Sequence, residues 1–243
     1  EDGEFAAVAH ISQDYSNGDG REIEPVIRDL HGYKLAFALQ GCIRNYDDLS
    51  LRLREDRRII DISEREAGIV PHILQLKHGR TLEDRLAQVS QHLEGAFSII
   101  GLTQGGRIFV MQDKGGVTPL VAGKGKDGHS IFIASETSAL EIGKAKEVQQ
   151  IPYGTVVFFE GLAASVYDPD AKAFPSQCIA FSDFKPNSVF LPGKISYGAL
   201  MERLGKELAR FAPVHDVDYV TYLPDSGRLA AQPTLPDSPG LRP

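Results

Sequence analysis

The chain has 243 residues, of which 42% are hydrophobic and 24% charged, and its formal net charge is −7 at pH 7. A chain of this length and composition buries a substantial core, as one large domain or two modest ones. The acidic balance and the lack of a basic cluster argue against a nucleic-acid partner. No apolar run reaches the roughly 18 residues that a membrane-spanning helix needs, so we expect no membrane insertion.

The two cysteines, Cys42 and Cys178, bear on the cellular compartment. Two cysteines do not make a disulfide framework, so we expect a reducing, cytoplasmic location. The acidic first residues are unlike a signal peptide. Because residue 1 is Glu rather than Met, we expect either a processed chain or one that begins part-way into a longer protein.

The first 41 residues predict two strands. The apolar run from Glu4 to Ser12 is typical of a buried strand, and Tyr33 to Leu39 predicts a second strand that ends at Gln40-Gly41.

Three helices follow in the predicted order. Asn45 is expected to cap the first, and Ser63 with Glu66 forms a capping box before the second, which has Pro71 near its first turns. The third has the most regular helical stripe, with apolar residues at offsets 0, 4, 7 and 11. Its residues are Leu82, Leu86, Val89 and Leu93.

From Leu93 to Phe159, short β-branched and aromatic runs alternate with Gly-rich turns, which predicts a stack of antiparallel strands that continues through Ala163 to Tyr167. Within it, Gly123 to Gly128 reads as a hairpin loop and not a phosphate-binding loop, since no helix follows. Farther on, Tyr197 to Phe211 predicts an amphipathic helix and Val217 to Leu223 a strand.

These elements predict four segments. We expect a first domain over residues 1–168, a linker over 169–176, a second, partial unit over 177–231 and a disordered, Pro-rich tail over 232–243.

Several short motifs resemble class II glutamine amidotransferases over roughly residues 5 to 231. Ala134-Ser135-Glu136 and Ile151-Pro152-Tyr153-Gly154 are similar to motifs of the glutaminase domain. The segments Cys178 to Phe181, Phe184 to Ser188 and Pro224 to Arg228 resemble the glutamine phosphoribosylpyrophosphate amidotransferase branch, which opens purine synthesis. One stretch, Gly41 to Tyr46, is nearer to the glucosamine-6-phosphate synthase branch.

The resemblance implies an α+β fold, a four-layer αββα sandwich of the Ntn-hydrolase type, followed by the start of an α/β phosphoribosyltransferase-like unit. Periodicity alone would allow a generic α+β domain.

The family's chemistry uses an N-terminal Cys whose own α-amino group acts as the base. Residue 1 here is Glu, and neither Cys42 nor Cys178 matches the position of that nucleophile. The resemblance implies that several dozen residues carrying it precede Glu4, so we expect no catalytic nucleophile in this chain.

The resemblance also places a remnant glutamine pocket at His10, Gln40, Gly41, Ser63 and Glu64. Gln40-Gly41 stands where the family has Asn-Gly as oxyanion donors, and the longer side chain misplaces the amide by about 1 Å. His10 opens a motif that lacks the family's Arg, and Ser63-Glu64 replaces Ser-Asp.

Two Arg positions of the strand region are replaced by Gln112 and Thr118. Changes at several parts of one site favour a pseudoenzyme.

Each pocket residue also has an ordinary interpretation. His10 fits a hydrogen-bonded core residue, Gln40-Gly41 fits a strand-ending turn, and Glu64 fits an acid that favours a helix N-terminus. Both interpretations stay open from sequence alone.

Farther along, Asp225, Ser226 and Gly227 form a remnant phosphoribosyltransferase motif. Cys178 matches a position that ligates an iron–sulfur cluster in some relatives, but a cluster takes four thiolates and the chain has two. The histidines show no metal-ligand spacing. We therefore expect neither a metal site nor a cofactor.

These observations leave three hypotheses. The first is a non-catalytic amidophosphoribosyltransferase-like protein that acts as a scaffold, partner subunit or ligand sensor, with glutamine as a candidate ligand and a homo- or hetero-oligomer as a candidate assembly. The second is a fragment or subunit of an active amidotransferase that passes ammonia from glutamine to a phosphoribosyl or other sugar-phosphate acceptor. The third is an inert, degraded paralogue.

Overall fold

A computed structural model describes residues 5–11, 24–30, 32–57, 66–167, 190–191, 195–213, 221–223 and 227–231. The chain divides into two compact units. One comprises residues 1–135 and 144–177, the other residues 136–143 and 178–243, and each is described by itself.

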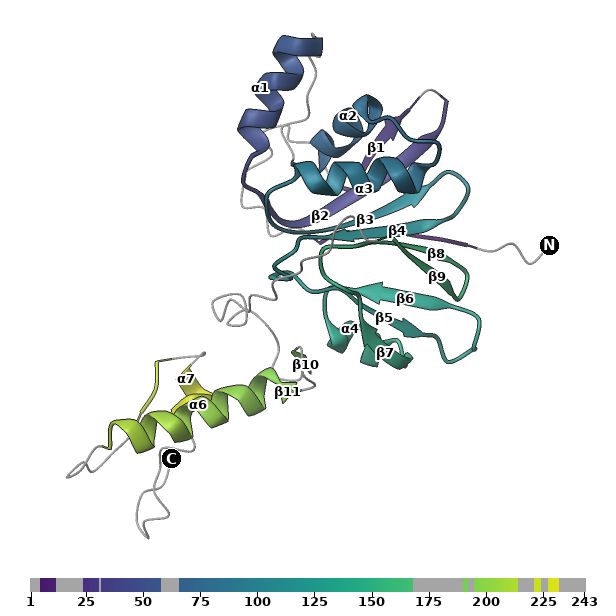
Figure 1. The fold of residues 1–243 in the computed structure, drawn as a ribbon. Coiled ribbons are helices and arrows are strands. Elements are labelled where there is room, and N and C mark those ends of the chain that lie inside the picture. The colour runs from purple at the N-terminus through teal and green to yellow at the C-terminus, as the bar shows by residue number, and fades with distance from the viewer. Residues whose placement is uncertain are drawn as a thin grey trace. The chain divides into compact units, whose positions relative to one another are not determined.

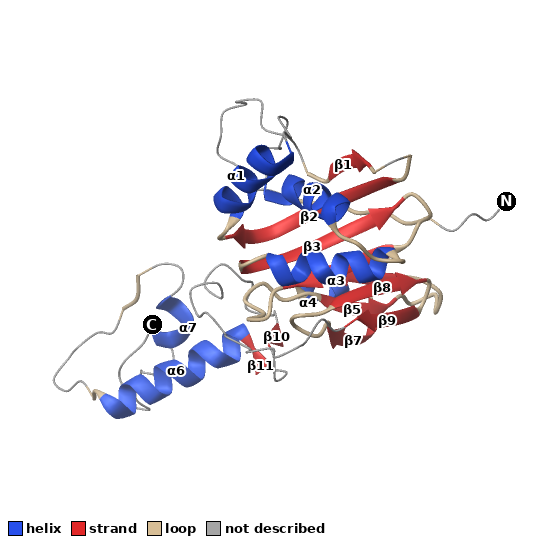
Figure 2. Ribbon diagram, turned by 45° about the horizontal axis from the view of Figure 1, so that its top comes forward, coloured by secondary structure: helices blue, strands red, loops and turns tan. Residues whose placement is uncertain are grey.

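A six-stranded antiparallel sheet dominates the first unit (Figures 1 and 2). Its order is β1-β2-β3-β4-β8-β9. Hairpins join β1 to β2, β3 to β4 and β8 to β9, whereas the helices lie between β2 and β3 and a long excursion lies between β4 and β8. The strands are β1 (Val26–Asp29), β2 (Lys34–Ile43), β3 (Gly95–Thr103), β4 (Ile108–Gln112), β8 (Val156–Glu160) and β9 (Ala163–Tyr167).

The excursion between β4 and β8 contains a three-stranded antiparallel sheet in the order β6-β5-β7. Its strands are β5 (Val121–Lys124), β6 (Ile131–Ala134) and β7 (Lys146–Gln150). In the loop between β5 and β6, the Asp127 carboxylate accepts hydrogen bonds from the His129 and Ser130 amides and the Ser130 hydroxyl, which lowers its pKa to about 2.

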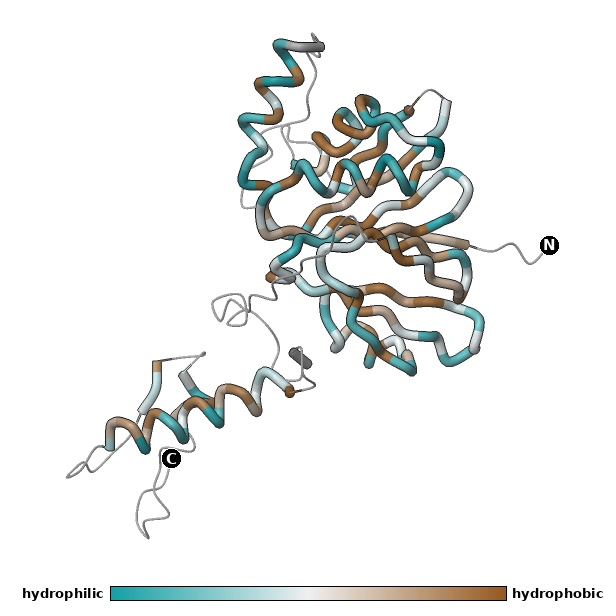
Figure 3. Tube along the Cα trace, in the orientation of Figure 1, coloured by the Kyte–Doolittle hydropathy of each residue, from teal (hydrophilic) through white to brown (hydrophobic). Residues whose placement is uncertain are grey.

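The helices of this unit precede β3. They are α1 (Tyr46–Arg57), a 3₁₀ turn (Glu66–Gly68) that leads into α2 (Ile69–Leu76), and α3 (Leu82–His92). Thr81 caps α3, because its hydroxyl accepts a hydrogen bond from Asp84 N at 3.1 Å. Hydrophobic residues concentrate in α2 and the central strands (Figure 3).

The large sheet has an apolar core on each face, as the period-two alternation of a strand requires. Phe109 and Phe158 belong to the core that the sheet shares with α2 and α3, and their ring centroids lie 5.6 Å apart. Their neighbours Val110 and Val157 point to the other face and pack with residues of the three-stranded sheet. The six-stranded sheet is therefore a middle layer between helices and the smaller sheet.

Arg107 ties three segments of this unit together. Its Nη2 donates to Glu83 Oε1 at 2.5 Å, its Nε lies against the Glu160 carboxylate, and its guanidinium carbon is 4.7 Å from the centroid of the Phe158 ring. Burial alone would raise the pKa of Glu83, but hydrogen bonds to its own backbone amide and to Arg107, with the charge of Arg107, lower it. The cluster links α3 to the start of β4 and the end of β8, which lie side by side in the sheet.

The second unit contains α4 (Thr137–Ile142), a two-stranded antiparallel pair and two further helices. The pair is β10 (Phe190–Leu191) and β11 (Ile195–Ser196), and the helices are α6 (Tyr197–Phe211) and α7 (Gly227–Ala231). Ser196 caps α6 by accepting from Ala199 N at 3.2 Å. A Cβ at Gly205 would lie 2.0 Å from Ala230 O, so α6 and α7 are in close contact.

The mixed α/β fold with antiparallel sheets is as the sequence predicted, and so are the helices at 82–92 and 197–211. Three expectations are wrong. Residues 5–11 are not in a strand, because their main chain makes no ladder with other described residues. Strand β2 does not end at Gln40-Gly41 but continues to Ile43. Residues 221–223 are not in a strand.

Asn45 is also used differently from the prediction. Its Oδ1 accepts from Glu94 N at 3.0 Å and its Nδ2 donates to His92 O at 2.9 Å, so the amide ties the start of α1 to the α3–β3 junction. The predicted linker 169–176, the tail 232–243, Ser63 and residues 217–220 lie outside the described residues. None of the helices that the structure describes is both long and apolar enough to cross a membrane.

We predict that Arg107→Met lowers the free energy of unfolding by about 1–3 kcal/mol at pH 7, since it leaves the 11%-exposed Glu83 side chain without its cation. Because the pKa of Glu83 is lowered in the folded protein, the ion pair stabilises above the unfolded value of about 4.3 and is lost as the pH falls. Urea unfolding at pH 7 and pH 3.5 measures both effects.

The matched control is Arg44→Met, which removes an exposed ion pair with Glu94 and should cost under about 1 kcal/mol. Equal losses for the two variants would contradict the assigned role of Arg107.

Candidate functional site

The second half of β2 carries two of the predicted pocket residues, Gln40 and Gly41, and glycines set the backbone geometry here. Gly41 has φ +109° and Gly95, which lies on β3, has φ +146°. A Cβ on Gly41 would lie 2.1 Å from Ala96 O, and one on Gly95 would lie 2.2 Å from Cys42 O. Neither position accepts a side chain, so β2 and β3 approach each other here as only glycine permits.

A row of polar residues crosses the sheet beside this point. Gln40 pairs with Ser98, and Ser98 pairs with Gln112, so the three side chains share one face. That face is the one toward the three-stranded sheet, because Val110 and Ile100 on the same strands pack there. Gln40 is exposed, whereas Ser98 and Gln112 are buried.

Hydrogen bonds join this row to Thr118. Ser98 Oγ donates to the Thr118 carbonyl, and Gln112 Nε2 donates to the same carbonyl at 3.0 Å and to Ser98 Oγ at 3.3 Å. Gln112 Oε1 is buried without a hydrogen-bond partner among the described residues. The two positions at which the resemblance implies arginine, Gln112 and Thr118, thus form one buried, uncharged cluster with Ser98.

His10 reaches β2 through Glu24. His10 Nδ1 lies 3.1 Å from Glu24 Oε2, which also accepts a hydrogen bond from Leu39 N at 2.7 Å. The Glu24 side chain is only 8% exposed. Glu24 therefore holds His10 beside Leu39, the residue that precedes Gln40. The sequence motifs did not single out Glu24.

A second carboxylate, Glu66, holds the far end of β2. It accepts a hydrogen bond from Ile43 N and lies beside Cys42. Burial, the charge of Glu66 and a hydrogen bond to Glu66 all raise the pKa of the Cys42 thiol. Cys42 is free and exposed, but its thiolate is disfavoured, the opposite of an activated nucleophile.

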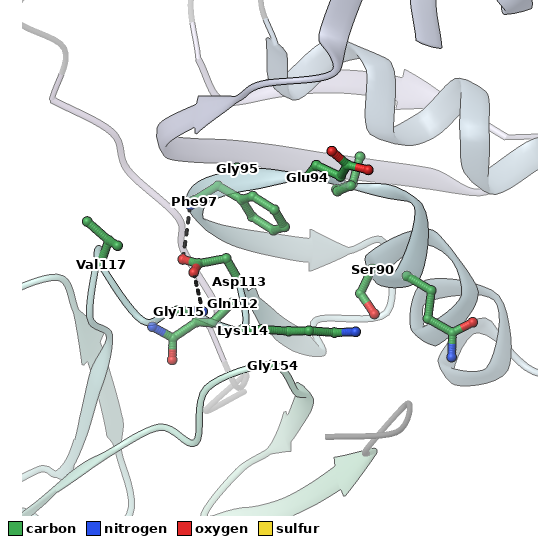
Figure 4. Close-up of a pocket in the computed structure, with 12 residues that line it drawn as sticks. Ser90, Glu94, Gly95, Phe97, Gln112, Asp113, Lys114, Gly115, Val117 and Gly154 are labelled. Carbon is green, nitrogen blue, oxygen red and sulfur yellow. Dashed lines mark hydrogen bonds between the residues drawn. The ribbon is translucent and has the colours of Figure 1, made fainter. Parts of the chain in front are cut away.

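A cavity of about 410 Å³ lies near the start of β3, bordered by the end of α3, the turn after β4 and Gly154 (Figure 4). Asp113 is on its wall and is buried. Figure 4 shows Lys114 extending away from Asp113 toward Ser90 of α3.

Asp113 is a structural clamp. Its Oδ1 accepts from Gly115 N at 2.6 Å and Gly116 N at 2.9 Å, and its Oδ2 accepts from Phe97 N at 3.1 Å. Burial raises the pKa of Asp113, and the backbone N–H groups only partly offset that effect. With three N–H donors bound, the carboxylate shapes the turn and is not positioned as a general base.

Other predicted site residues fall elsewhere. Ser63, Glu64, Asp225 and Ser226 lie outside the described residues, and Gly227 begins α7. Among the described residues, no group of three or more His, Cys, Asp and Glu side chains could hold a metal ion.

Comparison with known proteins shows the family. Residues 16–142, just over half of the chain, match the family model described as a glutamine amidotransferase domain. The chain belongs to the glutamine amidotransferase family. The amidotransferase domain is similar to the chloroplastic amidophosphoribosyltransferase of Glycine max, with 27% identity over 93% of this chain and 39% of that protein. Amidophosphoribosyltransferase 1 of Arabidopsis thaliana is 29% identical over 94% of this chain and 40% of its own length, and the Staphylococcus aureus enzyme (strain Mu50) is 27% identical over 93% and 45%.

Solved structures agree in fold. Glutamine phosphoribosylpyrophosphate amidotransferase from B. subtilis, complexed with ADP and GMP, superimposes with a TM-score of 0.77 at 24% identity over 86% of this chain and 45% of that one. A structure of the allosteric regulatory enzyme of purine biosynthesis gives the same TM-score over 86% and 44%. This amidotransferase chain spans less than half the length of the relatives it matches.

We predict that Gly41→Ala destabilises the protein by more than about 4 kcal/mol, because the new methyl group would meet the Ala96 carbonyl in addition to the strained φ. Gly106→Ala is the control, since Gly106 has φ +83° and a Cβ there would have no neighbouring atom within 4 Å, and we expect a loss of about 1–2 kcal/mol. Thermal and urea unfolding compare them; similar losses would contradict the close approach.

We predict that Cys42 reacts slowly with iodoacetamide at pH 8, because its raised pKa leaves less thiolate than an ordinary cysteine has. Glu66→Gln removes the charge, lowers the pKa and should speed alkylation severalfold, while its amide oxygen can still accept from Ile43 N. Rates are measured by mass spectrometry in a Cys178→Ser background, and a slower rate in the variant would contradict this assignment.

Proposed function

We propose that this chain is the glutaminase-type domain of an amidophosphoribosyltransferase-like protein and that it releases no ammonia from glutamine. In this proposal it acts as a scaffold, partner subunit or glutamine sensor. The observation that carries the proposal is the uncharged, largely buried row formed by Gln40, Ser98, Gln112 and Thr118. The resemblance would place an oxyanion donor and two arginines at three of these four positions.

Oxyanion stabilisation depends on donor placement. The Gln40 side chain is one methylene longer than that of the Asn that the resemblance implies. The backbone at Gln40 cannot shift to compensate, because the next residue, Gly41, is packed against Ala96. A donor displaced by about 1 Å can cost roughly 10²-fold in rate. The Gly41 backbone itself keeps the strand geometry. In this proposal the site still binds an amide although it no longer hydrolyses one.

Charge at the site is also changed. An arginine at position 112 or 118 would place a cation beside Ser98, whereas Gln112 and Thr118 use their polar groups on each other and on Ser98. A carboxylate ligand gains no ion pair from this cluster. Glu24 and Glu66 on either side of Gln40-Gly41 further disfavour an anion there.

Cys42 is the described thiol nearest the motif, and its raised pKa supports a non-catalytic assignment. The names of the relatives support the amidophosphoribosyltransferase type. A structural neighbour that is an allosteric regulatory enzyme of purine biosynthesis supports a link to purine synthesis. The cytoplasmic location expected from the low cysteine count, and the phosphoribosyltransferase-like nature of residues 177–231, belong to the same proposal.

The test is a calorimetric titration of the chain with L-glutamine, followed by an ammonia assay of the same sample. We expect no ammonia above a glutamine blank. Saturable heat that Gln40→Leu abolishes would favour a sensor, and absence of heat would favour a scaffold or partner subunit.

Gln40→Asn is the matched variant, since it shortens the side chain to the length the family uses. We expect it to alter glutamine binding without producing ammonia. Ammonia released by the unaltered chain would overturn the proposal and favour the active amidotransferase alternative, and its loss in Cys42→Ser would assign the nucleophile.

A further inference from the structure

We propose that Lys77 is a covalent modification site, at which the ε-amine takes an acyl group from a small activated donor and the imidazole of His92 takes the proton. The donor is an acyl phosphate or a thioester. This inference is independent of the proposed function, and it rests on contacts made where α2 and α3 end.

Lys77 and His92 meet because α2 and α3 pack against each other. Lys77 follows the last residue of α2, and His92 is the last residue of α3. Lys77 Nζ lies 2.7 Å from His92 Nε2. Gln88, one turn earlier in α3, donates from its Nε2 to the His78 carbonyl at 2.5 Å. This hydrogen bond keeps the residue after Lys77 beside α3.

The second ring nitrogen of His92 fixes the role of the first. His92 Nδ1 lies 2.8 Å from the Gln88 carbonyl oxygen, which can only accept, so Nδ1 carries the proton. In the neutral imidazole Nε2 then has a lone pair, and it accepts a hydrogen bond from Lys77 Nζ. The lysine nitrogen is therefore hydrogen-bonded to a base that can remove one of its protons.

The surroundings of Lys77 disfavour its ammonium form. Its side chain is half-buried, and among the described residues no carboxylate forms an ion pair with it. Burial lowers the pKa of Lys77, so more of it is the neutral amine than in an ordinary lysine. Because His92 is exposed, a donor from solvent can reach the pair.

Acyl transfer at this pair balances without a further reactant. The Nζ lone pair attacks the acyl carbon, and the C–N bond forms. The nitrogen, now positively charged, gives one proton to His92 Nε2, and the exposed ring releases that proton to solvent. The C–O or C–S bond to the leaving group then breaks, and phosphate or thiolate leaves with the bonding electrons. The product is a neutral secondary amide.

The contacts of Lys77 favour an acyl group over an aldehyde or an alkyl group. A secondary amide is uncharged, which suits a half-buried nitrogen, and its remaining N–H can still donate to His92 Nε2. An unprotonated imine has no N–H for that hydrogen bond, and an alkylated amine stays cationic. Of these three products, the amide alone keeps the hydrogen bond and removes the charge.

The first experiment measures acetylation rates at single lysines of the intact chain by peptide mass spectrometry, with acetyl phosphate in one arm and acetyl coenzyme A in the other. Lys126, exposed in the loop between β5 and β6, is the internal reference. We expect Lys77 to react at least about fivefold faster than Lys126 with one or both donors, and the faster donor identifies the source. Equal rates at the two lysines with both donors would overturn the proposal.

His92→Gln separates proton transfer from the hydrogen bond, since the Gln amide oxygen can accept from Lys77 but cannot take up a proton. We expect acetylation of Lys77 to slow at least about threefold, with the Lys126 rate unchanged. His78→Gln is the matched control, because His78 joins the cluster through its backbone carbonyl, and it should leave the Lys77 rate unchanged. An unaltered Lys77 rate in His92→Gln, or an equal loss in His78→Gln, would contradict the role of His92.

The second measurement needs no variant. Nitrogen-15 NMR of the neutral His92 ring reports which nitrogen carries the proton, and we expect Nδ1. A proton on Nε2 would leave no lone pair facing Lys77 and would overturn the proposal.

Discussion

The close approach of β2 and β3 at Gly41 and Gly95 is the constraint on which the site depends. The two strands stay in register over nine residue pairs, from Leu35 with Thr103 to Ile43 with Gly95. That register places Gln40 opposite Ser98 and, through β4, in line with Gln112. A Cβ on Gly41 would meet Ala96 O, and one on Gly95 would meet Cys42 O. Slippage by one residue would therefore break both this packing and the polar row.

The carboxylates flanking this point explain why the strand is so firmly held. Glu24 binds the amide of Leu39 and Glu66 binds the amide of Ile43, so acids from two separate segments fasten the strand on both sides of Gln40-Gly41. Glu66, which fastens the backbone, also raises the pKa of Cys42 through its charge and a hydrogen bond. The same acid therefore supports the strand and disfavours the Cys42 thiolate.

Sequence patterns predicted the elements whose signal is local. The 82–93 stripe and the apolar face of 197–211 became helices, and the Gly-punctuated runs after Leu93 became strands. Local patterns could not show that residues 5–11 lack a ladder with the described strands, or that the Asn45 side chain bonds the α3–β3 junction, since both depend on distant segments. Glu24, Ser98 and Asp113 were missed for the same reason: their roles exist only once the sheet register and the 113–116 turn are formed.

The three-stranded sheet lies in the chain between two strands that are neighbours in the larger one. β4 and β8 pair directly from Ile108–Phe159 to Met111–Val156, and the whole smaller sheet is traversed between them. That pairing, with the contacts of Arg107 to Glu83 and Glu160, joins segments far apart in the chain, and such non-local contacts favour slow folding. Loop-closure entropy grows only slowly with loop length. The excursion can therefore lengthen or shorten during evolution at little thermodynamic cost, provided that its two ends still meet.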